Sequence, residues 1–241
     1  MRILGPLEVE RHGSPVALPG KAHLALAWIA GARGPLAVRE LDGALWGRNG
    51  THVRVGRRHG ILREIDRLLG RGHLLVRSGT VTLDPRGIDV DADRFEGLLG
   101  RQAGRREANL AAALALWRGR ALPEISGDDP ATPQLARLRL QYVAATYELA
   151  SIRLAGPLAA PAIADLTRLL AEEPDRQPLR LLLAAGLAAG GRRVDALRVL
   201  RSTGRPASPG AAPDAAALEQ AILNDERDAL SAFIARTEPL M

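Results

Sequence analysis

The residues best suited to binding chemistry lie between positions 48 and 63, where the sequence reads RNGTHVRVGRRHGILR. This stretch contains five arginines and two histidines, and no acidic residue. If the stretch is helical, Arg54, Arg57 and Arg58 fall within about 100° of one another around the helix axis. Guanidinium groups grouped in this way can reach DNA phosphates or guanine edges together. The alternatives are that the three arginines form a solvated helix face, or that Arg58 extends outward to water from beside the core.

Four further residues are candidates for DNA contact. Thr51 is a suitable N-cap for a helix whose N-terminus binds phosphate, although it could be a purely structural cap. Arg77 lies beside the turn of a predicted hairpin, where it could approach the minor groove or simply be exposed. Lys21 and His23 open an earlier helix and could touch the DNA backbone. The predicted DNA-binding set is therefore Arg54, Arg57, Arg58, Thr51, Arg77, Lys21 and His23.

The elements that position these residues follow from patterns in the first 85 residues. Apolar runs around the turn signal Arg11-His-Gly-Ser14 predict a hairpin, and helical spacing predicts three helices before a second hairpin around Ser78-Gly79. The predicted elements are strands at 2–10 and 15–18, helices at 21–32 and 38–45, a third helix that follows within the basic stretch and stops at Gly70, and a hairpin at 73–85. This order is typical of a winged helix-turn-helix in which the third helix enters the major groove and the closing hairpin is the wing.

Two glycines complicate the third helix. Gly56 and Gly60 lie inside it, and each glycine in a helix costs about 1 kcal/mol relative to alanine. The sequence therefore predicts a recognition helix that starts late or bends near one of them. A straight helix from Thr51 to Leu69 would contradict this prediction.

Beyond Pro85 the strand patterns stop and helical patterns take over. Asp91 and Asp93 begin one helix, where the helix dipole favours carboxylates. Helices are also predicted at 107–117, 132–154, 158–172, 177–189, 193–202, 214–223 and 226–236. Short turns between antiparallel helices favour a tetratricopeptide-like array. The predicted fold class is thus mainly α with small β elements: a winged helix domain over 1–88, then an all-α helical domain over 89–241.

Charge and composition restrict the classes of function that are expected for this chain. Residues 1–90 carry 14 Lys and Arg against 8 Asp and Glu, whereas residues 91–241 carry 19 of each, so the net charge of +6 lies entirely in the first module. This asymmetry favours a nucleic-acid-binding module joined to a neutral one. The chain has no cysteine, its histidine spacing fits no metal motif, and it has no phosphate-binding glycine loop. We therefore expect no enzyme activity, cofactor, metal or membrane partner, and a cytoplasmic location.

Six segments, in order, resemble the Streptomyces antibiotic regulatory protein family. They are ILGPLEV at 3–9, LDGALWG at 41–47, DRFEGLL at 93–99, ALALWRGRAL at 113–122, AEEPDRQPLRLLLAAGLAAGGRRVDALRVL at 171–200 and ALEQAILNDERDAL at 217–230. The family joins a response-regulator-type winged helix, the effector fold of two-component systems, to a bacterial transcriptional activation domain.

The resemblance implies a transcriptional activator of a specialised-metabolite (antibiotic biosynthesis) gene cluster. It would bind direct repeats in promoter DNA, contact RNA polymerase holoenzyme, and pair with itself or a homologue. Gly56, Gly60 and His23 depart from the family pattern and leave an alternative open. In that alternative, the chain is a degenerate member that acts as a protein-interaction module with weak or no DNA binding.

Overall fold

The computed structural model describes residues 1–47, 54–84, 86–101, 105–125, 132–202 and 212–235. The chain forms two compact units. The first contains residues 1–104 and 112–140, and the second contains residues 105–111 and 141–241. The predicted domain boundary between residues 88 and 89 marks a change in the sequence pattern, from mixed strands and helices to helices. It stays a prediction.

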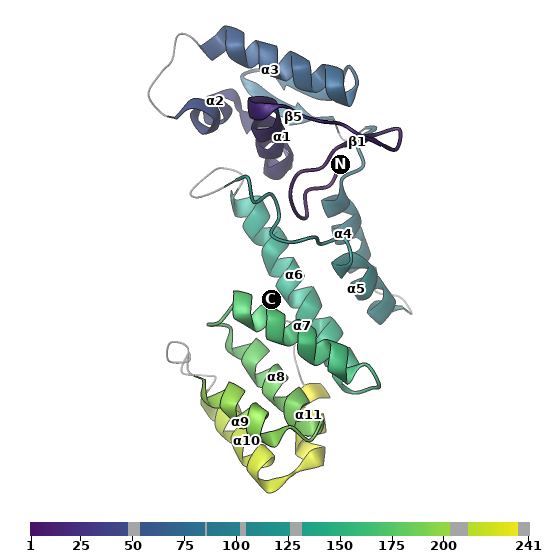
Figure 1. Cartoon of the computed structure of the whole chain (residues 1–241), viewed down its shortest axis with the longest axis vertical. Coiled ribbons are helices and arrows are strands. Elements are labelled where there is room, and N and C mark those ends of the chain that lie inside the picture. Colours follow the sequence, from purple (N-terminus) through teal and green to yellow (C-terminus); the bar gives the residue numbers. More distant parts are fainter. Residues whose placement is uncertain (48–53, 85, 102–104, 126–131, 203–211, 236–241) are drawn as a thin grey trace. The chain divides into compact units, whose positions relative to one another are not determined.

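The first unit has the element order expected for a winged helix (Figure 1). Its described elements are β1 (Glu10–Arg11), β2 (Ser14–Pro15), α1 (Gly20–Ala32), β3 (Leu36–Ala37), α2 (Val38–Trp46), α3 (Arg54–Leu69), β4 (Leu74–Arg77), β5 (Thr80–Leu83) and α4 (Asp91–Leu99). Helix α1 packs against α2, α3 and β5, and α3 also packs against β4. The core is mainly aliphatic, with Trp28 and Phe95 as buried aromatic residues. Its fully buried aliphatic side chains include Ile3, Leu4, Leu26, Ile29, Leu36, Leu41 and Ile65.

The first hairpin is much shorter than predicted. Only Glu10–Arg11 and Ser14–Pro15 pair as strands, with His12 and Gly13 in the turn. The prediction of strands over 2–10 and 15–18 is wrong because the chain folds back between Arg2 and Glu8, which form an isolated bridge. Ile3 and Leu4 are both fully buried. An alternating strand would send one of two neighbouring side chains outward, so this segment adopts a loop that buries both.

The second sheet contains the wing and one strand that the sequence analysis missed. Its order is β3-β5-β4, and all neighbours are antiparallel. The predicted hairpin is confirmed. Its two-residue turn has positive φ at Ser78 (49°) and Gly79 (76°), as a type I′ turn requires. Strand β3 escaped prediction because it is only two residues long and has no alternation to detect.

Helix α3 runs without interruption from Arg54 to Leu69. The two glycines therefore do not break the helix. The predicted late start or bend stays a prediction, because residues 51–53, where the start would be decided, lie outside the described part. A Cβ added at either glycine would meet no heavy atom within 4 Å. The helix tolerates both glycines because burial of Leu62 and Ile65 on its opposite side contributes more than local propensity.

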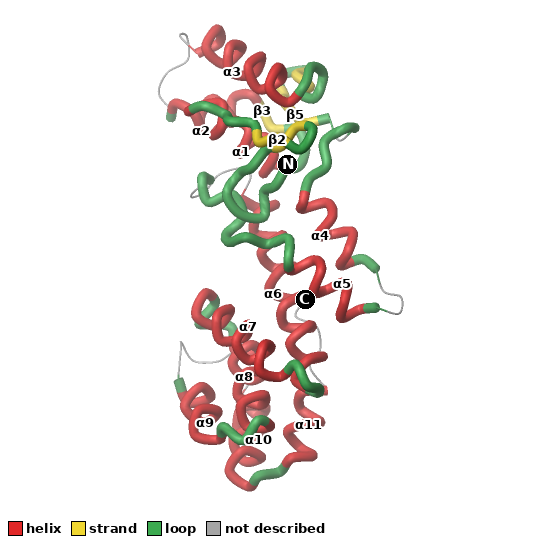
Figure 2. Tube along the Cα trace, turned by 45° about the vertical axis from the view of Figure 1, so that its right-hand side comes forward, coloured by secondary structure: helices red, strands yellow, loops and turns green. Residues whose placement is uncertain are grey.

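The second unit is built entirely of helices in the part that the structure describes (Figure 2). Its elements are the start of α5 (Arg106–Leu114), the second part of α6 (Thr132–Leu154), α7 (Ala159–Glu172), α8 (Gln177–Ala189), α9 (Arg193–Arg201), α10 (Ala212–Asn224) and α11 (Arg227–Ala235). Helix α8 is its centre, because it packs against α7, α9, α10 and α11. Successive helices joined by short turns agree with the predicted helical array. No helix in the described ranges is long and apolar enough to span a membrane.

Gly186 shows how tightly α8 packs. A Cβ at this position would lie 2.6 Å from Cδ2 of Leu154 on α6, which is itself buried. We expect Gly186→Ala to lower the free energy of unfolding by about 1–3 kcal/mol, measured by chemical denaturation, because overpacking strains a filled core. Gly97→Ala is the matched control. It lies in α4 with open space around its Cβ and should be neutral or stabilising. Equal effects at both positions would contradict the packing explanation.

Candidate nucleic-acid interface

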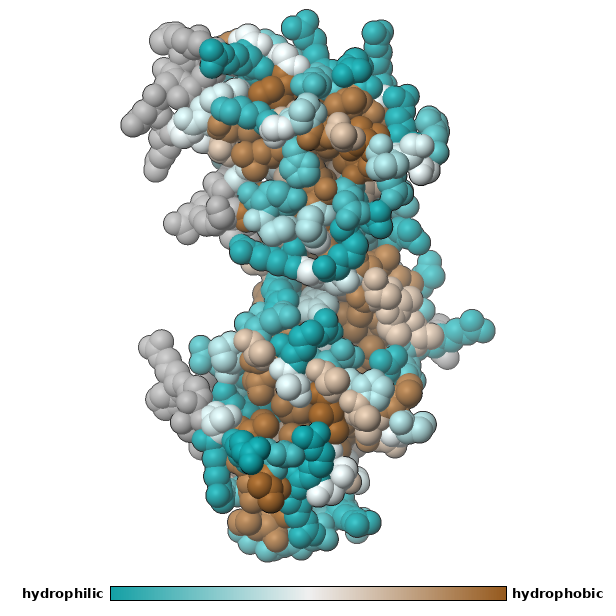
Figure 3. All heavy atoms as spheres, in the orientation of Figure 1, coloured by the Kyte–Doolittle hydropathy of each residue, from teal (hydrophilic) through white to brown (hydrophobic). Residues whose placement is uncertain are grey.

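Helix α3 presents opposite chemistry on its two sides. Leu62 and Ile65 are buried against the core, whereas Arg57, Arg63 and Arg67 are exposed. The exposed side contains no acidic residue between Val55 and Arg63. In Figure 3, hydrophilic side chains cover much of the surface over α3, with hydrophobic patches between them. A helix side of this kind suits binding to a polyanion.

The structure separates the three arginines of the predicted cluster. Arg57 is exposed, and none of the ion pairs within the described ranges involves it. Arg58 points the other way: its side chain is only 14% exposed, and Nη1 donates a hydrogen bond to Oδ2 of Asp42 on α2, at 2.5 Å. The described part includes the backbone of Arg54 but not its side chain, and Thr51 lies outside it. Arg58 therefore joins α2 to α3, and Arg57 is available to an external partner.

Lys21 has an internal partner at the start of α1. Its Nζ donates to the carbonyl oxygen of Leu45 at 3.0 Å and lies 4.8 Å from the ring centroid of Trp46. A cation at the C-terminal end of α2 is favoured by the helix dipole and by the aromatic face. Lys21 thus stabilises the junction of α1 and α2, and its predicted contact with DNA stays a prediction.

His23 also has a partner within the first unit. Its Nε2 lies 3.2 Å from Oε1 of Glu124, which also accepts a hydrogen bond from the N–H of Leu7 at 2.9 Å. Burial by itself would raise the pKa of Glu124. Hydrogen bonds from its own backbone N–H, from Leu7 and from His23 together outweigh burial, so the pKa of Glu124 is lowered. The contact with DNA predicted for His23 stays a prediction, and its ring lies beside a carboxylate.

The lowered pKa of Glu124 predicts a pH dependence of stability. A carboxylate whose pKa is lower in the folded state stabilises the fold above its unfolded pKa, and this stabilisation is lost as the pH falls through the folded value. Glu124→Gln should therefore lower the free energy of unfolding by about 1 kcal/mol at neutral pH. The difference from the parent protein should shrink below about pH 4, near the ordinary carboxyl pKa. Denaturant titrations at several pH values measure this difference, and a constant difference would contradict the assignment.

Arg77 occupies the wing. It is the last residue of β4, directly before the turn, and it is exposed without an ion pair to any residue that the structure describes. The type I′ turn holds the two strands in register, so the position of Arg77 relative to the hairpin is well defined. Arg57 and Arg77 are therefore the two predicted contacts whose described side chains are exposed and without a carboxylate partner.

Sequence reasoning missed the residues that hold the site together. Asp42 and Trp46 lie in the 41–47 segment that carries the family resemblance, and Glu124 lies outside the six segments. Their contacts were not predicted, because each acts on a residue distant in the sequence. Within the described ranges, no group of three or more His, Asp or Glu side chains is placed to hold a metal ion.

The two exposed glycines of α3 yield a direct test of its energetics. Because added methyl groups at Gly56 and Gly60 meet open space, alanine at each position should raise the free energy of unfolding by about 1 kcal/mol. Thermal and chemical denaturation of the single and double variants measure this gain. A loss of stability would mean that α3 is not helical through these positions in solution.

Comparison with known proteins found a family model and two curated relatives that match this chain. The family model described as "Bacterial transcriptional activator domain" matches residues 90–223. Regulatory protein AfsR of Streptomyces coelicolor is 28% identical over 218 residues, covering 84% of this chain and 22% of the relative. AfsR of Streptomyces griseus is 27% identical over 203 residues, covering 78% of this chain and 20% of the relative. The chain thus spans about a fifth of the length of these curated relatives.

A solved structure extends the similarity to almost the whole fold. Mycobacterium tuberculosis EmbR, solved in complex with a low affinity phosphopeptide, superposes with a TM-score of 0.74 and 26% sequence identity. The match covers 97% of this chain and 68% of the EmbR chain. The likeness therefore includes the winged helix elements as well as the helical region.

Proposed function

Since the chain belongs to the bacterial transcriptional activator domain family and is a regulator of the Streptomyces antibiotic regulatory protein type, not an enzyme, we propose that it activates transcription by binding promoter DNA. In this proposal residues 1–88 bind DNA and residues 89–241 form the activation domain. The protein acts in the cytoplasm and switches on a specialised-metabolite gene cluster.

One observation supports this proposal best. Arg57 on α3 and Arg77 on the wing are exposed, and neither has a carboxylate partner among the described ion pairs. In a winged helix the recognition helix lies in the major groove, and the wing lies beside it. Arg57, together with Arg54, would reach base edges or phosphates, and Arg77 would contact the adjacent backbone. Arg58 supports this arrangement indirectly, because its ion pair with Asp42 holds α2 against α3.

Activation requires more than DNA binding. We propose that two protomers bind side by side on direct repeats, and that the helical domain contacts RNA polymerase holoenzyme. The support is family membership and the similarity to AfsR and EmbR.

Selection of duplexes from a genomic library, followed by mobility-shift assays of the recovered fragments, tests the proposal. Each arginine that binds a phosphate should contribute about −0.9 to the slope of log K against log salt concentration. We expect a slope of about −2 or steeper if Arg57 and Arg77 both bind phosphates. Retention of no duplex at low salt would overturn the proposal.

A specific observation supports a second candidate. Lys21, His23 and Arg58 all have internal partners, so fewer cations are free for DNA than the sequence suggested. The chain would then act as a protein-interaction module that pairs with a DNA-binding homologue. Co-purification with such a homologue, together with an absence of DNA retention, would favour this candidate.

A further inference from the structure

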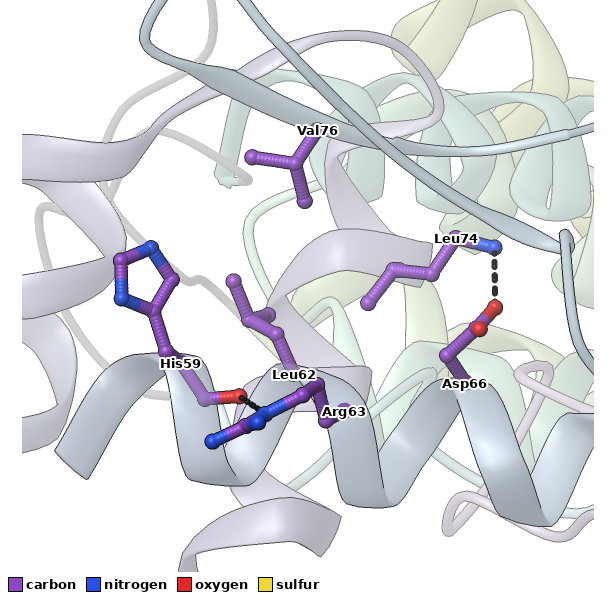
Figure 4. Close-up of a pocket in the computed structure, with 6 residues that line it drawn as sticks. All are labelled: His59, Leu62, Arg63, Asp66, Leu74 and Val76. Atoms are coloured by element: carbon purple, nitrogen blue, oxygen red, sulfur yellow. Dashed lines mark hydrogen bonds between the residues drawn. The ribbon is translucent and has the colours of Figure 1, made fainter. Parts of the chain in front are cut away.

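An open groove separates α3 from the first strand of the wing. Its volume is about 460 Å³. Leu62, Leu74 and Val76 supply its apolar surface, and His59, Arg63 and Asp66 form the polar part of its lining (Figure 4). Val76 is 49% exposed and lies in the groove lining with Leu62 and Leu74. The groove lies wholly within the first unit.

The groove lies along the outer edge of a sheet. Among the strands that the structure describes, in the order β3-β5-β4, strand β4 has a neighbour on one side only. The N–H of Asp84 donates to the carbonyl of His73 at 2.8 Å, so these two residues form a hydrogen-bonded pair. Because such pairs alternate along an antiparallel ladder, Leu75 and Arg77 bond to β5, and Leu74 and Val76 direct their N–H and C=O groups outward.

Asp66 closes one end of this edge, and the other end has no hydrogen-bond partner among the described residues. Oδ1 of Asp66 accepts a hydrogen bond from the N–H of Leu74 at 3.1 Å and another from the N–H of Gly72 at 3.0 Å. This carboxylate fixes the start of β4 to α3. At the other end, the outward N–H and C=O of Val76 face the groove side of the wing, where a further strand could pair with them.

The chemistry of an added strand follows from the alternation of side chains. Residues of that strand on the α3 side would pack on Leu62 and Val76. Residues on the opposite side would lie across from Arg77, which is exposed. Arg63 lies on the α3 side and is exposed at the rim, where it adds to the positive potential along the groove. The groove therefore fits a segment in which apolar residues alternate with acidic ones.

We propose that the α3–β4 groove binds an extended acidic segment of a partner protein, which adds to the sheet as a strand beside β4. A second copy of this chain fits poorly, because two β4 edges would bring Arg63 and Arg77 toward their own counterparts. A nucleic acid would satisfy the arginines, but it would leave the apolar surface of the groove without a matching group. The inference does not depend on the proposed function, since the partner here is a polypeptide.

The probe is a fluorescein-labelled peptide of alternating valine and glutamate, titrated with the full chain in an anisotropy assay. The matched control peptide alternates valine and lysine. A second control carries N-methylated valines, which cannot donate to a strand edge. We expect saturable binding of the valine–glutamate peptide, and binding about tenfold weaker or absent for both controls.

Variants of the chain locate the peptide. Val76→Pro removes an outward N–H without removing a bond to β5, and Val76→Lys keeps the N–H but places a charge over the groove. Each should weaken binding about tenfold, and thermal melting verifies that each variant folds. Arg77→Glu should weaken the glutamate peptide about fivefold and strengthen the lysine peptide.

Three results would overturn the proposal. These are no saturable binding of the valine–glutamate peptide, equal binding of the glutamate and lysine peptides, or unchanged binding by both folded Val76 variants. Amide hydrogen exchange tests whether duplex DNA, and not a peptide, occupies this strand edge. Protection of Val76 by duplex DNA but not by the peptide would assign this edge to DNA. Failure of the peptide assay alone would leave DNA retention by the chain unaffected, so the two proposals fail separately.

Discussion

Replacing Arg57 with alanine is expected to weaken binding to promoter DNA by about tenfold to a hundredfold. Arg57 is exposed on α3, and no described ion pair occupies its guanidinium group. Because the described residues give the Arg57 side chain no ion pair or hydrogen bond, the variant should fold with unchanged stability. If Arg57 contacts a phosphate, the slope of log K against log salt concentration should also become shallower by about 0.9.

Two controls give this prediction its specificity. Arg168→Ala removes the same charge from a 62% exposed side chain in the second unit, and it should leave DNA affinity unchanged. Arg58→Ala should act differently, because it breaks the half-buried pair with Asp42 and lowers the free energy of unfolding by about 1–3 kcal/mol. Equal losses of affinity for Arg57→Ala and Arg168→Ala, measured by mobility shift, would remove Arg57 from the interface.

Replacing Asp91 with alanine is expected to lower the free energy of unfolding by about 3 kcal/mol. Asp91 is only 5% exposed, and its two carboxylate oxygens accept hydrogen bonds from the N–H of Ile3 at 2.8 Å and of Leu4 at 3.1 Å. Alanine would leave two buried N–H groups without acceptors, and each such group costs about 1–3 kcal/mol. Chemical denaturation measures the loss, and hydrogen exchange at Ile3 and Leu4 should rise with it.

Asp89→Ala is the matched control for Asp91. Its carboxylate is 73% exposed and lies 3.9 Å from Arg94, so its removal should change stability by less than about 0.5 kcal/mol. A comparably small effect at Asp91 would show that water replaces the carboxylate, and that the N-terminal segment does not depend on it.

Much of the fold could be predicted because its signals are local. Helices α6 and α8 begin and end where the sequence analysis placed them, at 132–154 and 177–189, since apolar periodicity and helix-terminating turns are both encoded nearby in the chain. The wing hairpin was predictable for the same reason, because Ser78-Gly79 suits a two-residue turn. The first hairpin was not, because burial of both Ile3 and Leu4 depends on elements far along the chain.

The candidate site was likewise only partly predictable from the sequence. Basic composition pointed to residues 48–63 as the candidate recognition helix, but it could not rank Arg57 against its neighbour Arg58. That difference depends on the placement of Asp42 beside α3, which involves the packing of two helices. The same holds for Glu124, which lies 101 residues from His23 in sequence and 3.2 Å from it in space.

Sequence alone determined the family, the order of the elements and the excess of positive charge in the first module, because these properties reside in residue types and their local spacing. Tertiary structure alone decided which charges have partners. It turned Asp91 from a favourable residue at a helix N-terminus into the acceptor for the buried N-terminal segment, and it kept α3 continuous through Gly56 and Gly60. The physical reason is that ion pairing, burial and strand edges depend on distances between residues remote in the chain, and folding sets those distances.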